Sequence, residues 1–241
     1  MSGNSRHLGV QSTLLLTAFA AGTVDIIGFA ELGGVFPSAM TGNFALLAYH
    51  LARGESHSAL GSVIALSGFV TGCVLGFSLR RGREQKSALT LLLAGETALL
   101  LLFAAYVTRV APSMHGPSGR LLIAVLAIAM GLQAVVGQTI SLTTIVFTTT
   151  LTRLVGTIVD SIAASRPAAL QDVGMPAAVL LSYLCGAVLA ATLTVGKVNG
   201  VALLPVLAVS IALAAYRWGQ RTSRLARGPF RPGRRWIWPR S

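Results

Sequence analysis

Six long apolar segments constrain the fold of this 241-residue chain more than any other feature. Each is close to the ~20 residues that a helix needs to cross the hydrocarbon core of a bilayer. Backbone groups that face lipid must be hydrogen-bonded within their own segment, and the sequence lacks the short alternating segments of a membrane barrel, so helices are favoured. The predicted spans lie near residues 12–35, 58–79, 88–110, 120–140, 174–196 and 199–217. The sequence therefore predicts an all-α, polytopic transmembrane helix bundle of about six spans.

The basic residues predict how this bundle is oriented. The chain divides into an N-terminus (residues 1–11), a transmembrane domain (residues 12–217) and a tail (residues 218–241). With the N-terminus in the cytoplasm, fifteen basic residues lie on the cytoplasmic side and only four on the other. Those four are Arg53, Arg109, Arg120 and Lys197. The positive-inside rule therefore places both termini in the cytoplasm, and we expect a bacterial inner membrane protein.

The formal net charge of +12 also predicts the partners. Eight arginines lie between Arg217 and Arg240, close to three tryptophans. Such a segment binds the anionic lipid of the cytoplasmic leaflet. We expect the lipid bilayer as the main partner, with anionic lipids at the tail, and no nucleic acid.

Small residues at four-residue spacing indicate an internal repeat. The matched positions are Gly68, Gly72 and Gly76 in the second predicted span and Ser182, Gly186 and Ala190 in the fifth. An aromatic residue, Phe69 or Tyr183, follows the first member of each set. Because each half has three spans, the halves would form a 3+3 inverted repeat, as in many transporters. Close packing of helices alone explains the same spacing, so both interpretations stay open.

Three polar side chains lie inside predicted spans. Asp25 is in the first span, where a carboxylate costs on the order of 2.5–3.5 kcal/mol on insertion scales. It shares a helical face with small residues, which points it at a neighbouring helix or a cavity. Glu96 lies among leucines in the third span and Gln133 lies in the fourth. All three are candidates for a substrate or proton site, and hydrogen bonding between helices is the alternative.

The segment after the first span carries a second candidate site. Thr41, Gly42 and Asn43 follow Pro37 and Ser38, a composition typical of an unwound backbone that leads into a helix N-terminus. Such a terminus binds anions or polar solutes. Ordinary capping of a surface helix is the alternative. The irregular stretches 36–51 and 142–162 are expected to be re-entrant or surface helices.

No pattern for catalysis or for a cofactor occurs in the sequence. There is no Walker loop, no paired catalytic histidine, no zinc pattern and no nucleophile elbow. Cys73 and Cys185 have no companion ligands at metal-binding spacing. We therefore expect neither an enzyme nor a bound metal or cofactor.

Four motifs resemble those of a known family. The motifs are Gly22–Asp25, Leu32–Phe36, Met40–Asn43 and Ala129–Gln133. They are similar to the pattern of the YoaK-like bacterial membrane proteins, a family catalogued as domain of unknown function 1275. The resemblance extends from about Leu14 to Tyr216 and implies a six-helix inner-membrane protein without an assigned activity.

The chain departs from the family at one point. Where the second half of the family usually reads Thr-Gly-Thr, this sequence has Thr148, Thr149 and Thr150. A second unwound hinge is therefore less well supported than the first.

The leading hypothesis from the sequence is a secondary transporter or permease for a small polar solute, with or without coupling to protons. The alternative is a non-transporting membrane scaffold or assembly partner. Substrate, coupling ion, direction and oligomeric state do not follow from the sequence.

Overall fold

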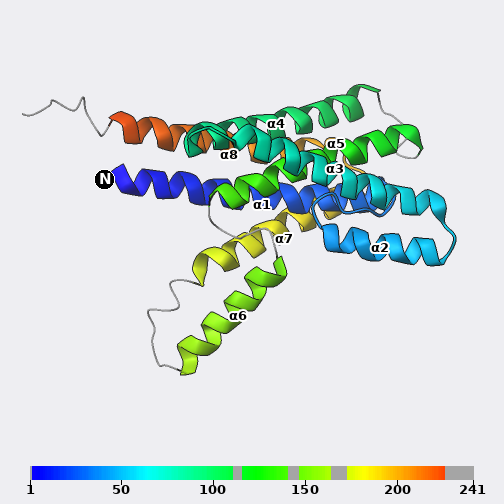
Figure 1. Cartoon of the computed structure of the whole chain (residues 1–241), viewed down its shortest axis with the longest axis horizontal. Helices are drawn as coiled ribbons and strands as arrows, with labels where there is room; N and C mark the ends of the chain where they lie inside the picture. The colour runs from blue at the N-terminus through cyan, green and yellow to red at the C-terminus, as the bar shows by residue number, and fades with distance from the viewer. Residues whose placement is uncertain (1, 111–115, 141–146, 164–172, 226–241) are drawn as a thin grey trace, which may run out of the picture.

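The computed structural model describes residues 2–110, 116–140, 147–163 and 173–225. Within these ranges every regular element is a helix (Figure 1). The described helices are α1 (Ser2–Glu31), α2 (Met40–Ala52), α3 (Ser56–Arg80), α4 (Gln85–Val110), α5 (Pro117–Thr139), α6 (Phe147–Ala163), α7 (Gly174–Val195) and α8 (Leu203–Leu225).

Six of the described helices are long and apolar enough to cross a membrane. These are α3, α4, α5 and α7 over their full lengths, α1 over Leu8–Glu31 and α8 over Leu203–Thr222. They coincide with the six predicted apolar segments, which confirms the all-α, polytopic fold. The predicted lipid-binding tail falls outside the described residues from residue 226 onward.

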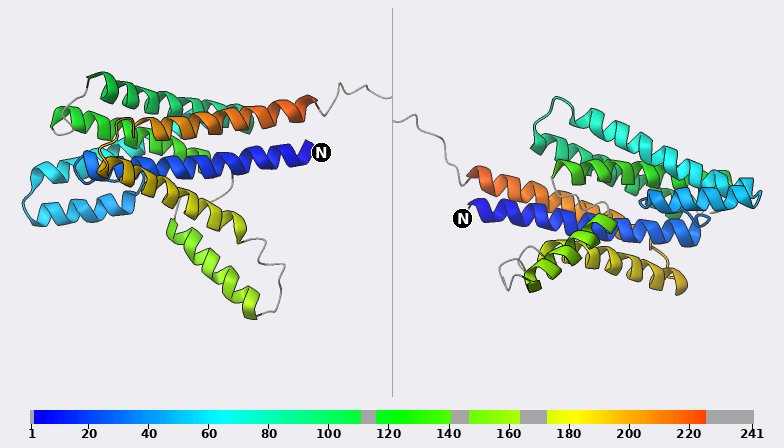
Figure 2. Two further views of the ribbon diagram at one scale, coloured as in Figure 1. Left: turned by 180° about the vertical axis from the view of Figure 1, so that it is seen from behind. Right: turned by 60° about the horizontal axis from the view of Figure 1, so that its bottom comes forward.

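The six long helices pack as two groups of three, which contact each other. In the first group α1 contacts α7 and α8, and in the second α5 contacts α3 and α4. The two groups also meet directly where α4 packs against α8. Figure 2 shows α1 running through the middle of the bundle, with α7 on one side and α8 on the other.

Glycines bring two pairs of helices into backbone contact. A methyl group at Gly22 of α1 would collide with the Tyr183 carbonyl of α7, and one at Gly186 would collide with the Phe19 carbonyl. The pair α3 and α5 repeats this arrangement. There, Gly72 faces the Ile128 carbonyl and Gly131 faces the Phe69 carbonyl. In all four cases the glycine lies three residues after the residue whose carbonyl meets the opposite glycine, so the two interfaces match position by position.

The helix ends gather at two opposite ends of the bundle. The start of α1 and the end of α8 lie at the same end of the bundle (Figure 2). Arg80 and Gln85 both donate to Thr139 at the end of α5, at 3.3 Å to its hydroxyl and 2.6 Å to its carbonyl. This end is called the basic end, because residues 80–86 carry four cations there. The opposite end holds Glu31 and the start of α3.

The first helix ends four residues before the predicted boundary, at Glu31 instead of residue 35. Gly33 and Gly34 adopt φ angles of 85° and 80°, in which an α-helix cannot continue. The chain then folds back along α1, and α2 returns to the opposite end to form a hairpin with α3. Residues 32–52, which fold back in this way, are called the re-entrant segment. In contrast, α6 lies beside α7 at the edge of the bundle (Figure 1).

Candidate functional site

The re-entrant segment approaches α1 closely at a small residue, Gly28. Gly28 lies so close to the segment that an added Cβ would come within 2.5 Å of Pro37 Cδ and 2.7 Å of the Val35 carbonyl oxygen. A stacked pair of rings, Phe29 and Phe36, reinforces the contact at a centroid distance of 5.2 Å. This close approach places Ser38 opposite Asp25, one turn closer to the middle of α1.

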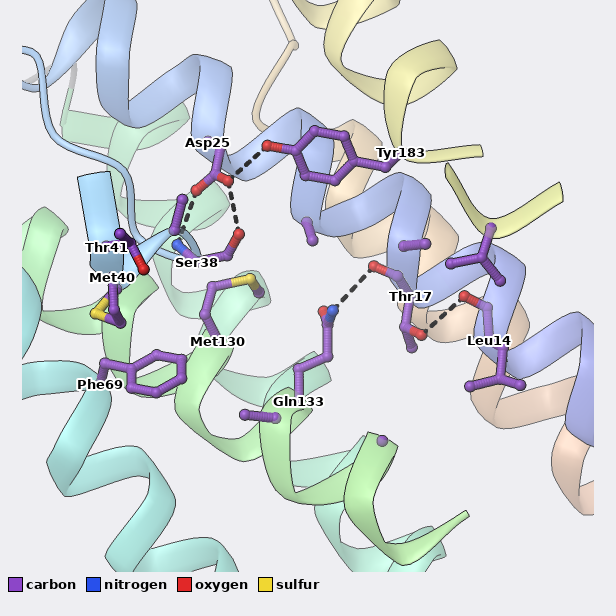
Figure 3. A pocket seen from close by; sticks show the side chains of 16 residues that line it. Leu14, Thr17, Asp25, Ser38, Met40, Thr41, Phe69, Met130, Gln133 and Tyr183 are labelled. Carbon is purple, nitrogen blue, oxygen red and sulfur yellow. Dashed lines mark hydrogen bonds between the residues drawn. The ribbon is translucent and has the colours of Figure 1, made fainter. Parts of the chain in front are cut away.

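Asp25 accepts hydrogen bonds from two different elements. The Ser38 backbone N–H donates to Oδ1 at 2.8 Å, and the Ser38 hydroxyl donates to Oδ2 at 2.6 Å. The Tyr183 hydroxyl of α7 donates to Oδ2 at 2.8 Å (Figure 3). The Asp25 side chain is 1% exposed, so these bonds replace the water that its oxygens would otherwise bind. The carboxylate therefore joins α1, the re-entrant segment and α7.

Asn43 stabilises the re-entrant segment from within. Its Oδ1 accepts a hydrogen bond from the Phe36 N–H at 3.0 Å, and its Nδ2 donates to the Phe36 carbonyl at 2.6 Å. An asparagine side chain can pair with a peptide group in this way because it carries the same donor and acceptor. Gly42 packs beneath the Phe36 ring. A Cβ added to Gly42 would lie 3.2 Å from Cδ2 of that ring. Both residues thus fix the turn that presents Ser38.

Asp25 lies at the wall of a cavity of about 350 Å³. Figure 3 shows the labelled side chains around this space, contributed by α1, α3, α5, α7 and the chain from Ser38 into the start of α2. The lining consists of Leu14, Thr17, Ala18, Ala21, Asp25, Ser38, Ala39, Met40, Thr41, Phe69, Met130, Gln133, Ala134, Gly137, Val179 and Tyr183. On α1 it extends from Leu14 to Asp25, about 16 Å along the helix axis at 1.5 Å per residue.

The cavity is mostly apolar, with acceptors at defined points. Gln133 donates from Nε2 to the Thr17 carbonyl at 3.1 Å, while its Oε1 is buried and has no hydrogen-bond partner among the described residues. The Thr17 hydroxyl donates back to its own helix, to the Thr13 carbonyl at 2.9 Å. A ligand in the cavity would therefore meet the Asp25 carboxylate and the Gln133 amide oxygen as acceptors. This arrangement fits a small, partly apolar molecule that carries hydrogen-bond donors.

The structure brings together some of the residues predicted from the sequence and separates others. Asp25, Thr41 and Gln133 all line the cavity. Gly42 and Asn43 do not line it, and instead shape the turn behind it. Asp25 is also nearer one end of its span than predicted. It lies six residues before the end of α1, about 9 Å along the axis, because the helix stops at Glu31.

Glu96 lies outside this cavity. It is fully buried on α4, between Leu92 and Leu100 on the same helical face. Neither of its carboxyl oxygens has a hydrogen-bond partner among the described residues. Its position in an apolar layer separates it from Asp25, so the two carboxyls do not form one site.

Sequence reasoning did not find the partners of Asp25. Tyr183 stood out only as an aromatic residue in the repeat, and Ser38 only as a polar residue in the turn. The comparison of the two halves contained a usable signal, because Phe69 occupies the position that matches Tyr183 and lacks the hydroxyl. A hydroxyl present in only one half marks a residue with a task beyond packing.

Comparisons with known proteins agree with this architecture. A family model described as "Protein of unknown function (DUF1275)" matches residues 13–216. The chain is also similar to the "UPF0700 transmembrane protein YoaK" of Bacillus subtilis (strain 168), with 30% identity over 193 residues. That alignment covers 75% of this chain and 83% of the relative. No solved structure matches the chain.

Proposed function

This chain belongs to the DUF1275 family of multi-pass membrane proteins, and we propose that it is a secondary transporter or permease for a small polar solute. The observation that carries the proposal is the cavity at Asp25. It combines an intramembrane carboxylate with a re-entrant segment, and irregular backbone inside a membrane domain occurs where it is buried in protein or lines a cavity. The fifteen basic residues on one side favour a bacterial inner membrane location with both termini in the cytoplasm.

The chemistry of the lining limits the class of solute. Asp25 and the free Oε1 of Gln133 both accept hydrogen bonds, so the solute should donate them. An ammonium, amide or hydroxyl group on a small apolar body meets this requirement. A volume of about 350 Å³ suits a molecule of that size. Proton coupling would use Asp25. Its Oδ2 accepts hydrogen bonds from the hydroxyls of both Ser38 and Tyr183. A proton on Oδ2 would therefore require one of these hydroxyls to turn and accept a hydrogen bond instead.

The matched interfaces divide the proposed transporter into two mechanical units. The pairs α1 with α7 and α3 with α5 are each held by glycine contacts between backbones, and each pair takes one helix from each half of the chain. The cavity lies between the two pairs, because it is lined by α1 and α7 on one side and by α3 and α5 on the other. A 3+3 inverted repeat accounts for this arrangement. Rocking of one pair against the other would then expose the cavity to alternate sides.

A membrane scaffold is the competing function, and one observation favours it. Asp25 already has donors from Ser38 and Tyr183, which is what a purely structural carboxylate requires. The scaffold hypothesis predicts a closed cavity. Transport predicts one that water reaches from both sides during the cycle.

Sided labelling of a cysteine in the cavity separates the two functions. In a background with Cys73→Ser and Cys185→Ser, Ala134→Cys places a thiol on the cavity wall. A membrane-impermeant maleimide is applied to spheroplasts and to inside-out vesicles. Glu84→Cys at the basic end and Ser56→Cys at the opposite end, both at exposed positions, report which side each reagent reaches.

Transport predicts that the Ala134→Cys thiol reacts from both sides, and that a bound solute changes the ratio of the two rates. The end positions should each react from one side only, with Glu84→Cys reacting in inside-out vesicles if the basic end is cytoplasmic. Labelling of both end positions without any reaction at Ala134→Cys would refute the transport proposal.

A further inference from the structure

A second depression lies at the basic end of the bundle. It is a groove of about 530 Å³ between the start of α4 and the end of α8. Its lining consists of Arg83, Lys86, Ser87, Thr90, Leu91, Ala94, Arg217, Gln220 and Arg221. None of these residues lines the cavity at Asp25.

The charge of this groove is entirely positive. Arg83 and Lys86 contribute from one wall, and Arg217 and Arg221 from the other. No carboxylate lines the groove, and none of the four cations forms an ion pair with an acidic side chain in the described part of the chain. Four cations without an acidic partner at one groove favour an anionic ligand, because an anion reduces the repulsion between like charges. The Ser87 hydroxyl adds a donor to the same wall, whereas the Thr90 hydroxyl donates to the Lys86 carbonyl of its own helix at 3.0 Å.

The groove is also amphiphilic along its depth. Lys86 lies in the first turn of α4, whereas Leu91 and Ala94 lie about 7.5 Å and 12 Å further along the helix axis, toward the membrane core. Leu91 is exposed, so its side chain faces the groove and the lipid next to it. The start of α4 also places the positive end of a helix dipole beside the cations. A ligand with an anionic head and an apolar chain matches this gradient.

We propose that the groove between α4 and α8 binds the phosphate of an anionic phospholipid, with an acyl chain running along Leu91 and Ala94. The four cations and the Ser87 hydroxyl surround the phosphate, and the apolar lower wall contacts the chain. This site would fix the ends of α4 and α8 at the headgroup level. It is separate from the proposed transport cavity, so either proposal can fail without the other.

Native mass spectrometry of the full chain in detergent tests the site. The protein is titrated with phosphatidylglycerol and, separately, with phosphatidylethanolamine. The variant Arg83→Gln/Arg221→Gln removes two cations from the groove. The matched control Arg109→Gln/Lys197→Gln removes two exposed cations from the opposite end. All proteins keep residues 222–241 unchanged, so lipid binding by this part of the tail contributes equally.

We expect wild type to prefer phosphatidylglycerol over phosphatidylethanolamine. The groove variant should bind phosphatidylglycerol about 25-fold more weakly, at about fivefold per removed cation, while the control variant binds like wild type. Equal loss in both double variants, or no loss in the groove variant, would overturn the proposal.

Two further arms identify the source of the phosphate and the role of the chain. Inorganic phosphate and glycerol 3-phosphate are added as competitors at millimolar concentration. If the site is for lipid, neither should displace phosphatidylglycerol, because the contacts of the chain are absent from both. Full displacement by either soluble phosphate would overturn the lipid assignment and identify a site for a free phosphate compound. The variant Leu91→Gln should weaken phosphatidylglycerol binding and leave phosphate binding unchanged.

Discussion

Replacing Tyr183 by phenylalanine tests the hydrogen bonding that organises the cavity. The change removes the one hydroxyl that α7 donates to Asp25, at 2.8 Å, and keeps the ring. Asp25 retains the N–H and the hydroxyl of Ser38. The cost should therefore be that of one hydrogen bond to a charged group, about 1.5–3 kcal/mol. For a chain of this size that lowers the melting temperature by about 3–12 °C.

Far-ultraviolet circular dichroism in detergent is the suitable assay, because all three tryptophans lie at or beyond Trp218 and their fluorescence does not report on the cavity. The control is Tyr49→Phe, which deletes the hydroxyl of a tyrosine that is 55% exposed and accepts a bond from Arg53. Its effect should be small, since exposed groups exchange such bonds with water. A Tyr183→Phe midpoint no lower than that of Tyr49→Phe would show that α7 does not hold Asp25 in place.

Four other substitutions have effects of predictable direction on the free energy of unfolding, measured in the same way. Glu96→Leu should stabilise the protein by about 1–3 kcal/mol, because it removes a buried carboxyl without a described partner; a large loss would reveal a partner for that carboxyl. Asn43→Ala should destabilise by about 2–4 kcal/mol, as it leaves both polar groups of Phe36 unpaired, and an unchanged midpoint would contradict the clamp. Gly186→Ala should destabilise by about 1–3 kcal/mol, whereas Gly156→Ala, with open space around it, should gain up to about 1 kcal/mol; equal effects at the two glycines would contradict the backbone contact.

The sequence predicted the class of fold because hydrophobic length alone is informative in a bilayer. Each long apolar segment became one long helix, and the small residues of α3 and α7 became points of helix contact. The boundary of α1 was wrong by four residues. The apolar stretch continues to Val35, but Gly33 and Gly34 end the helix, and hydropathy does not report φ angles.

The candidate site was predicted only in part. Asp25 and Gln133 were found because polar groups in apolar segments are costly and therefore conspicuous. Asn43 was predicted as part of an unwound turn before a helix, and the structure has this turn, but the Asn43 side chain pairs with Phe36 and is not among the residues that line the cavity. The contact between Asp25 and Ser38 spans thirteen residues through a chain reversal, and the contact with Tyr183 spans most of the protein. Neither follows from local spacing.

Ligand-induced stabilisation of the purified protein tests the central claim most directly. A panel of small amines, amides, polyols and metabolites is screened for a rise in melting temperature against wild type, Asp25→Asn and Ala134→Leu, with Asp160→Asn at an exposed position as the control for loss of a carboxylate. Ala134→Leu adds bulk to the cavity wall and keeps the Asp25 carboxylate, so it keeps the test valid if Asp25→Asn folds poorly. We predict that at least one hydrogen-bond donor stabilises wild type and Asp160→Asn but neither cavity variant. A compound that stabilises all four proteins equally, or a panel that stabilises none, would contradict a solute site at Asp25.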